Sequence, residues 1–582
     1  MHQLYTKWGR ALDPRNILPE YPRPQMVRGG YRSLNGAWSY AIGRAGKLGR
    51  IPSCFDGIIQ VPFSPESALS GVGRQLGPDE VLWYDRTFSL GEIHGRILLH
   101  FGAVDQTADV LVNGHPAVSH TGGYLPFSCE ITGLVHPGRN EIAVRVTDRS
   151  DTSYHARGKQ KLERGRMFYT ATSGIWQSVW LEEVPDRYIT SLDIRPDFDT
   201  SVLHLCVHTN GEEKGSAFVT VYVPAIYEKE NSPGMTLTSV TVPVNRMAKI
   251  PIPEKKAWTP DAPYLYYFDV QMGEDTVRSY FALRTFTVEK RSENGREIPR
   301  LCLNHEVLFQ KGVLDQGYWP DGILTAPSDE AMIFDLTEMK KTGFNMVRKH
   351  LKIEPERWYY HCDRLGLIVW QDMVNGGGKY RHWMVTYLAT PVSLLGLPTT
   401  DRVHFLLARS SKEGRQEYVR ELGETIRLLR NHPSICTWVL FNEGWGQFDT
   451  NEMVRRARVL DPTRLVDEAS GWYDQRGGDF VSIHNYFFPL FVHPEKERAN
   501  VLTEFGGAVW YVPGHSFGKK VYGYGVCESR EALNRTYRQK NSEMTALIPK
   551  GLCGSVYTQW TDVEDEVNGI FTYDRAVRKI DG

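Results

Sequence analysis

Alternating hydrophobic and polar positions dominate the first third of the chain. Runs such as 83–90, 95–101 and 108–112 are apolar at about every second position, which is the period of a half-buried β-strand. The dipeptide Asn113-Gly114 follows one of these runs and is typical of a two-residue hairpin turn. We therefore predict that residues 1–185 form an all-β sandwich.

A second set of short strand patterns follows. Apolar, β-branched runs occur at 201–207, 217–223 and 267–272. About a hundred residues of such strands is the size of an immunoglobulin-like domain. We predict an immunoglobulin-like β-sandwich for residues 186–289.

The pattern changes near residue 290, where apolar runs begin to alternate with helical periodicity. Helical spacing is seen after Ser328, a candidate N-cap, and the helix is expected to stop at Gly343. Eight strand candidates are present: 308–314, 345–351, 367–372, 435–443, 464–468, 480–484, 500–504 and 554–560. This arrangement predicts a (β/α)8 TIM barrel over residues 290–582, with lid loops at 376–411 and 506–530.

Composition excludes several classes of function. The chain has 68 Lys plus Arg against 69 Asp plus Glu, a net charge of -1, which gives no electrostatic reason to bind nucleic acid or an anionic membrane. The eight cysteines form no CxxC pair, which argues against a zinc ribbon, an iron–sulfur site or a thioredoxin-like motif. We expect neither a metal nor an organic cofactor. There is no signal-like or membrane-spanning apolar run, and we expect a cytoplasmic protein.

Polar side chains gather where the predicted barrel strands end, the face that carries catalytic groups in this fold. Two of them, Glu443 and Glu504, are carboxylates on different strands, which suits acid/base and nucleophilic chemistry. Each of these side chains could instead be a buried, hydrogen-bonded group that only stabilises the fold. The candidate site residues are Arg348, His350, Asp372, Asn442, Glu443, His484, Tyr486, Glu504 and Trp560.

Three motifs resemble signatures of glycoside hydrolase family 2, which contains β-galactosidases, β-glucuronidases and β-mannosidases. They are Arg-Asn-His-Pro-Ser-Ile from 430 with Asn442-Glu443, Asn-Met-Val-Arg-Lys-His over 345–350, and Leu-Thr-Glu-Phe-Gly-Gly from 502. Gly102-Ala-Val-Asp105 is similar to a motif of the family's sugar-binding jelly roll. The resemblance implies a jelly roll, an immunoglobulin-like domain and then the barrel.

The resemblance also implies roles for the residues. Glu443 would be the general acid/base and Glu504 the nucleophile of a retaining double displacement, which needs carboxyl groups about 5–5.5 Å apart. Asn442 would bind the sugar 2-hydroxyl, Arg348 and Tyr486 would keep Glu504 ionised and oriented, and Trp560 would form the floor of the −1 subsite. His350, Asp372 and His484 are expected to contact substrate.

The sugar is harder to predict. Family glucuronidases carry an Asn-x-Lys that grips the substrate carboxylate, whereas the comparable stretch 562–570 has no lysine and four acids. We therefore expect a neutral β-hexoside, with Lys379 or Arg381 able to substitute for the missing lysine if the sugar is a glucuronide. Among neutral sugars we expect a β-galactoside, only because β-galactosidases are common in the family the sequence resembles. The alternatives are a β-glucuronidase, an α-L-arabinofuranosidase or β-galactofuranosidase, a transglycosidase, and a catalytically silent carbohydrate-binding protein. A carbohydrate is the expected partner, and a homo-oligomer is compatible with the sequence.

Overall fold

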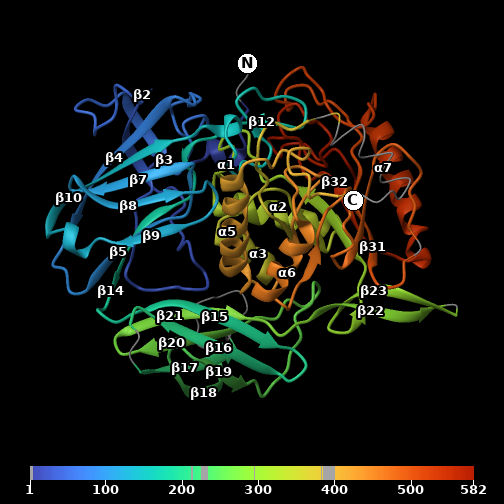
Figure 1. Cartoon of the computed structure of the whole chain (residues 1–582), viewed down its shortest axis with the longest axis horizontal. Coiled ribbons are helices and arrows are strands. Elements are labelled where there is room, and N and C mark those ends of the chain that lie inside the picture. Colours follow the sequence, from blue (N-terminus) through green and yellow to red (C-terminus); the bar gives the residue numbers. More distant parts are fainter. Residues whose placement is uncertain are drawn as a thin grey trace.

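The computed structural model describes residues 4–581 except 212–213, 224–233, 294, 382, 384–399 and 494. Figure 1 shows the N-terminal sandwich beside the barrel, with the second sandwich below both. This is the predicted architecture of jelly roll, immunoglobulin-like sandwich and TIM barrel. Part of the predicted lid loop 376–411 lies outside the described residues.

The N-terminal sandwich packs two antiparallel sheets over one core that includes Trp38, Tyr84 and Phe101. One sheet has the order β1 (Tyr31–Ser33), β14 (Val179–Val184), β5 (Arg96–Phe101), β9 (Phe127–Glu130). The other has the order β3 (Gly57–Val61), β2 (Gly36–Arg44), β4 (Glu80–Leu90), β10 (Gly138–Thr147), β7 (Thr107–Val112), β8 (His115–Thr121). Asn113 and Gly114 have φ of 49° and 77°, as the hairpin turn between β7 and β8 requires.

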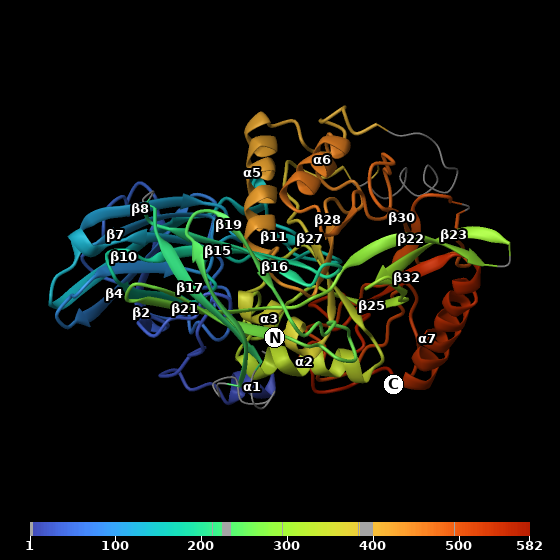
Figure 2. The same cartoon turned by 90° about the horizontal axis from the view of Figure 1, so that it is seen from below.

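The immunoglobulin-like sandwich also has two antiparallel sheets. The first is β15 (Ile189–Asp197), β16 (Val202–Thr209), β19 (Met247–Pro251), and the second is β18 (Met235–Pro243), β17 (Ser216–Val223), β20 (Tyr266–Met272), β21 (Asp275–Phe281). Next along the chain, β22 (Phe286–Glu293), β23 (Arg296–Leu303) and β24 (Glu306–Val307) form a small sheet whose hairpin projects from the molecule in Figures 1 and 2.

Eight parallel strands form the barrel. Their order is β29 (Leu465–Asp467), β28 (Ile435–Val439), β27 (Ile368–Asp372), β26 (Met346–Lys349), β25 (Gln310–Asp315), β32 (Leu552–Thr558), β31 (Ala499–Gly506), β30 (Phe480–Asn485). The N–H of Asp479 donates to the carbonyl of Val466 (2.8 Å), which joins the two ends of the order. All eight predicted strands are present.

Helices cover the outside of the barrel. They are α2 (Asp329–Lys341), α3 (Glu356–Leu365), α5 (Lys412–Leu429), α6 (Thr450–Leu460) and α7 (Arg530–Thr545). The Ser328 side chain accepts from the N–H of Ala331, so the predicted N-cap is confirmed. Short elements complete the fold: α1 (Lys7–Arg10), β6 (Val104–Asp105), β11 (Gln160–Lys161), β12 (Tyr169–Thr170) and β13 (Gly174–Ile175).

A buried ion-pair network ties the two sandwiches together. Glu182, on β14, accepts from Arg23 at 2.7 Å and from Arg28 at 3.3 Å. Arg28 also donates to Asp275 of the immunoglobulin-like domain at 2.9 Å. Burial alone would raise the pKa of Glu182, but Arg23 and His100 outweigh it and hold that pKa well below its usual range.

Replacing Glu182 with alanine should destabilise the fold by about 3–5 kcal/mol, because the partly buried Arg23 would lose its ion-pair partner and the buried Arg28 would keep only Asp275. Since the folded-state pKa of Glu182 is lowered, its stabilisation is present above the pKa of an unfolded glutamate and is lost as the pH falls below it. Urea unfolding at pH 7 checks the first point. A matched change at the exposed Glu130, which pairs with Arg96, should leave the melting temperature unchanged.

Candidate active site

The candidate residues come together at the carboxyl ends of the barrel strands. Arg348 lies in β26, Asp372 ends β27, His484 lies in β30 and Glu504 in β31. Asn442 and Glu443 follow β28. Ion pairs and hydrogen bonds connect Arg348, His350, Asp372, Asn442, Glu443, His484, Tyr486 and Glu504.

Glu504 is buried and held from two sides. Arg348 Nη1 donates to its Oε1 at 3.2 Å, and the Tyr486 hydroxyl donates to its Oε2. Burial alone would raise the pKa of this carboxyl, but the charges of His484 and Arg348 outweigh it and lower the pKa to about 2. Glu504 is therefore a carboxylate at neutral pH.

Arg348 is fixed by Asp372. Its Nε and Nη2 donate to the two Asp372 oxygens at 2.9 and 3.0 Å, and Nη2 also donates to Asn442 Oδ1 at 2.8 Å. His350 Nδ1 donates to Asp372 Oδ2 at 2.6 Å. Burial, Lys159 and Arg348 keep the pKa of His350 well below its usual range, so the ring is neutral and its Nε2 is an acceptor.

Asp372 does not fit the role predicted for it. Its side chain is only 1% exposed, and both oxygens are taken by Arg348 and His350. Because its acceptors are directed at these two residues, Asp372 orients them and has no free face for a sugar.

Glu443 is positioned by an unusual backbone. Its φ is 51°, in the left-handed region that side chains other than glycine seldom adopt, and its N–H donates to the carbonyl of Ser470 at 2.9 Å. The side chain contacts His484, whose Nδ1 lies 2.8 Å from Glu443 Oε1. Strained backbone of this kind is concentrated at functional sites.

One imidazole stands between the two carboxylates. His484 Nε2 lies 3.7 Å from Glu504 Oε1 and 3.0 Å from the Ser470 hydroxyl. One atom each from Glu443, His484 and Glu504 lie within 4.8 Å of one another, a spacing that could also hold a metal ion. A cation there would occupy both carboxylates.

Trp560 does not form a subsite floor. Its side chain is 0% exposed and packs on Phe571, with ring centroids 5.0 Å apart. Strand β32 ends at Thr558, so Trp560 lies beyond the strand, where the chain has turned. No face of its indole is free to stack on a sugar.

Sequence reasoning missed three residues of this site. Tyr524, from the loop after β31, stacks on Tyr486 with centroids 3.8 Å apart and planes at 10°. Trp472 packs edge-on against His484 at 5.4 Å. Lys159 comes from the jelly roll, and its charge contributes to lowering the pKa of Glu504. None belongs to a recognised motif, although the run 157–166 around Lys159 has five basic residues.

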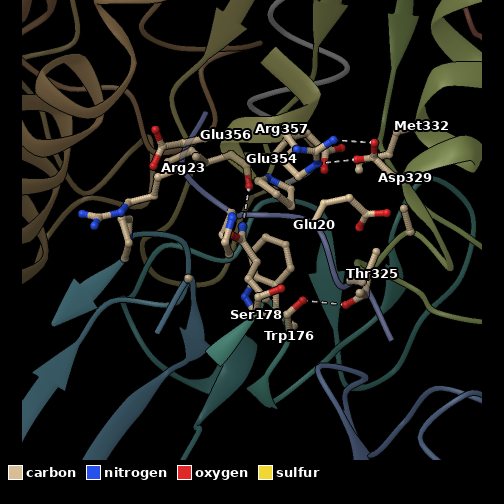
Figure 3. Close-up of a pocket in the computed structure, with 18 of the residues that line it drawn as sticks. Glu20, Arg23, Trp176, Ser178, Thr325, Asp329, Met332, Glu354, Glu356 and Arg357 are labelled. Atoms are coloured by element: carbon tan, nitrogen blue, oxygen red, sulfur yellow. Dashed lines mark hydrogen bonds and ion pairs between the residues drawn. The ribbon is translucent and has the colours of Figure 1, made fainter. Parts of the chain in front are cut away.

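A separate cavity lies between the jelly roll and helices α2 and α3. Figure 3 shows Glu20 there, between the Arg357–Asp329 ion pair and the hydrogen bond that joins Thr325 to Trp176. None of the candidate residues lines it. Its volume of about 60 Å³ suits a few water molecules, so it is a cavity of the domain interface. The part of the chain that the structure describes also contains no helix both long and apolar enough to cross a membrane.

Three family models match most of the chain. Residues 76–185 match the sugar binding domain of glycosyl hydrolases family 2, residues 187–284 match the model described as glycosyl hydrolases family 2, and residues 301–500 match the TIM barrel domain of that family. The matched segments follow the order of the two sandwiches and the barrel.

Among curated proteins, one named "Putative beta-glucuronidase" from Formosa agariphila is 25% identical over 461 residues, covering 71% of this chain and 50% of that protein. A β-galactosidase of Thermoanaerobacter pseudethanolicus is 27% identical over 400 residues, covering 66% of this chain and 48% of that protein. The chain thus spans at most about half the length of these relatives.

Among solved structures, a β-glucuronidase of an uncultured Clostridium has a TM-score of 0.73 at 19% identity, covering 96% of this chain and 98% of that one. A β-galacturonidase from Eisenbergiella tayi, bound to galacturonate, has a TM-score of 0.68 at 19% identity, covering 96% and 97%. At this identity the likeness is one of fold.

Proposed function

Because the chain belongs to glycoside hydrolase family 2, we propose that it is an exo-acting β-glycosidase that works by retaining double displacement. The observation that carries this proposal is the spacing of Glu443 and Glu504, which offer oxygens within 4.8 Å of each other. Retaining enzymes need carboxyl groups about 5–5.5 Å apart, whereas inverting enzymes leave about 6.5–9.5 Å for a water molecule.

In the first step Glu504 attacks the anomeric carbon while Glu443 gives its proton to the leaving oxygen. A glycosyl ester on Glu504 results. In the second step Glu443 takes a proton from water, which attacks the anomeric carbon and releases Glu504. His484 Nδ1 lies 2.8 Å from Glu443 Oε1 and holds this carboxyl group in place during both steps.

The neighbouring groups prepare the nucleophile and hold the sugar. Arg348 and Tyr486 contact the two oxygens of Glu504 and keep it ionised. Asn442 has its oxygen bound to Arg348, which leaves its NH2 group to donate to the sugar 2-hydroxyl. The neutral His350 offers Nε2 as an acceptor for another hydroxyl.

Two cations partly balance the acidic stretch 562–566, which weakens the expectation that it repels an anionic sugar. Lys579 pairs with Asp562 at 2.6 Å, and Arg164 lies 3.1 Å from Asp565 and 3.5 Å from Glu564. The fourth acid, Glu566, accepts from the Tyr169 hydroxyl and from Asn568. All four acids are therefore buried and partnered.

We propose a β-linked uronic acid as the sugar, a choice supported by this charge pairing and by the name of the Formosa relative. The β-galactoside predicted from the sequence is the second candidate, supported by the name of the Thermoanaerobacter relative.

Proton NMR of the first-formed product tests the mechanism, with p-nitrophenyl β-glucuronide, β-galacturonide, β-galactoside and β-glucoside as substrates. We expect turnover of one sugar class, with the β-anomer released first. An α-anomer as first product would contradict the retaining mechanism. Binding of all sugars with turnover of none would favour the silent carbohydrate-binding protein.

Changing Tyr486 to phenylalanine should move the acid limb of the kcat/KM profile to higher pH. The hydroxyl donates to the ionised form of Glu504, so its loss raises the pKa of the nucleophile from about 2. Because only the carboxylate attacks, activity is then lost at a less acidic pH, and kcat/KM at the optimum should fall about 10–100-fold. Tyr537→Phe, on helix α7, is the control and should change neither quantity.

A further inference from the structure

A basic segment of the jelly roll crosses the mouth of the barrel. Residues 157–166, here called the basic strap, hold five Lys or Arg and one acid. The N–H groups of Arg157 and Gly158 both donate to the carbonyl of Asn375, at 2.8 and 2.9 Å, which fastens the strap to the loop after β27.

Four of the five cations of the strap have a partner or face solvent. Arg157 donates to the carbonyls of Gly377 and Gly378. Lys161 lies over the ring of Phe168 at 3.7 Å, and Arg164 pairs with Asp565. Arg166 is exposed.

Lys159 differs from the other four. Its side chain is only 7% exposed, yet its ammonium has no hydrogen bond or ion pair with any residue that the structure describes. The nearest aromatic face, that of Tyr169, is 5.7 Å away. A buried ammonium normally requires an anionic or carbonyl partner.

The strap packs against the segment that carries His350. A Cβ on the preceding Gly158 would lie 2.7 Å from the carbonyl of Leu351, so the strap lies directly on the residue that follows His350. The charge of Lys159 acts on both His350 and Glu504. The ammonium is therefore close enough to His350 and Glu504 for its charge to act on both.

If the sugar is neutral, the positive charge of Lys159 disfavours the reaction. Positive charge develops on the sugar ring in the oxocarbenium-like transition state, and Glu504 loses its negative charge when it becomes an ester. A nearby unpaired ammonium then opposes the reaction. A carboxylate on the sugar would neutralise it throughout both steps.

We propose that Lys159 is a specificity-determining residue that pairs with the carboxylate of a uronic acid in the −1 subsite. The proposal rests on the proposed glycosidase function and goes further, because the jelly roll supplies the group that reads the sugar's charge. The Asn-x-Lys of family glucuronidases is missing from 562–570, and Lys159 takes over its task from another domain.

The test compares Lys159→Met with Lys161→Met, a change that removes a cation of the same strap. Substrates are the p-nitrophenyl β-glucuronide and β-galacturonide with the matching neutral glucoside and galactoside. For Lys159→Met we expect kcat/KM on the preferred uronide to fall about 100-fold or more, with a change of no more than about threefold on its neutral partner. Lys161→Met should leave both values near wild type, and Lys159→Arg should retain the preference for the uronide.

Equal losses on charged and neutral sugars, or no loss on either, would overturn the proposal. Misfolding is checked by the melting temperature, and a wild-type measurement does not depend on any variant: free glucuronate should inhibit more strongly than glucose. If the wild type turns over no glycoside, the proposed function fails, and calorimetric binding of glucuronate to wild type and Lys159→Met still decides the role of Lys159. Equal affinity of the two proteins for glucuronate would then refute it.

Discussion

Replacing Glu504 with alanine should lower kcat for the preferred glycoside by about 10⁴-fold or more. In the proposed mechanism this carboxylate forms the bond to the anomeric carbon, and no other described acid contacts both Arg348 and Tyr486. Initial rates with the preferred p-nitrophenyl glycoside measure the loss. Sodium azide should restore part of the rate, because a small anion can enter the space left by the side chain and attack the sugar directly.

The configuration of the azide product tests whether Glu504 is the nucleophile. Azide attacks once, so the glycosyl azide should have the α-configuration, opposite to that of the wild-type product. Glu497→Ala is a suitable control, since this glutamate is exposed and pairs only with Lys290. Wild-type turnover in Glu504→Ala, or a rescued β-azide, would rule out Glu504 as the nucleophile.

Replacing Glu443 with alanine should produce a loss that depends on the leaving group. For a poorly acidic alcohol, kcat/KM should fall about 100-fold or more, because no proton reaches the leaving oxygen. A dinitrophenolate leaves without a proton, so its release should stay fast in the first turnover. The second step then lacks its base, and stopped-flow traces should show a burst followed by slow turnover.

The matched control for this variant is Glu452→Ala, on helix α6, where the side chain makes only helical pairs with Arg455 and Arg456. It should leave the dependence on the leaving group unchanged. A Glu443→Ala enzyme that loses the same factor with every leaving group would show that Glu443 does not act as the proton donor.

Much of the fold could be predicted from local patterns. The period-2 alternation and the Asn113-Gly114 turn are properties of the chain itself, and the eight apolar runs after residue 300 correspond to the eight barrel strands. Parallel strands that run through a barrel core are continuously apolar, so each run is visible without its neighbours. Spacing alone also brought Arg348, Glu443 and Glu504 to one face.

The predictions that differ from the structure concern residues whose surroundings are set by tertiary contacts. Trp560 lies two residues past the end of β32, where strand alternation no longer sets the direction of a side chain. Asp372 carries the right chemistry, but only the structure shows that Arg348 and His350 use both of its oxygens. Lys159 is nearly two hundred residues from His350 in sequence, and no local pattern brings them together.

Because the basic strap is attached to the loop after β27, residues of two domains can contribute to one site. In the proposed function, residues of the barrel break the glycosidic bond, whereas Lys159 recognises the charge of the sugar from a jelly-roll segment held by the N–H groups of Arg157 and Gly158. Sugar preference can therefore drift or be re-engineered by substitutions in the N-terminal module alone, with no change to the catalytic carboxylates.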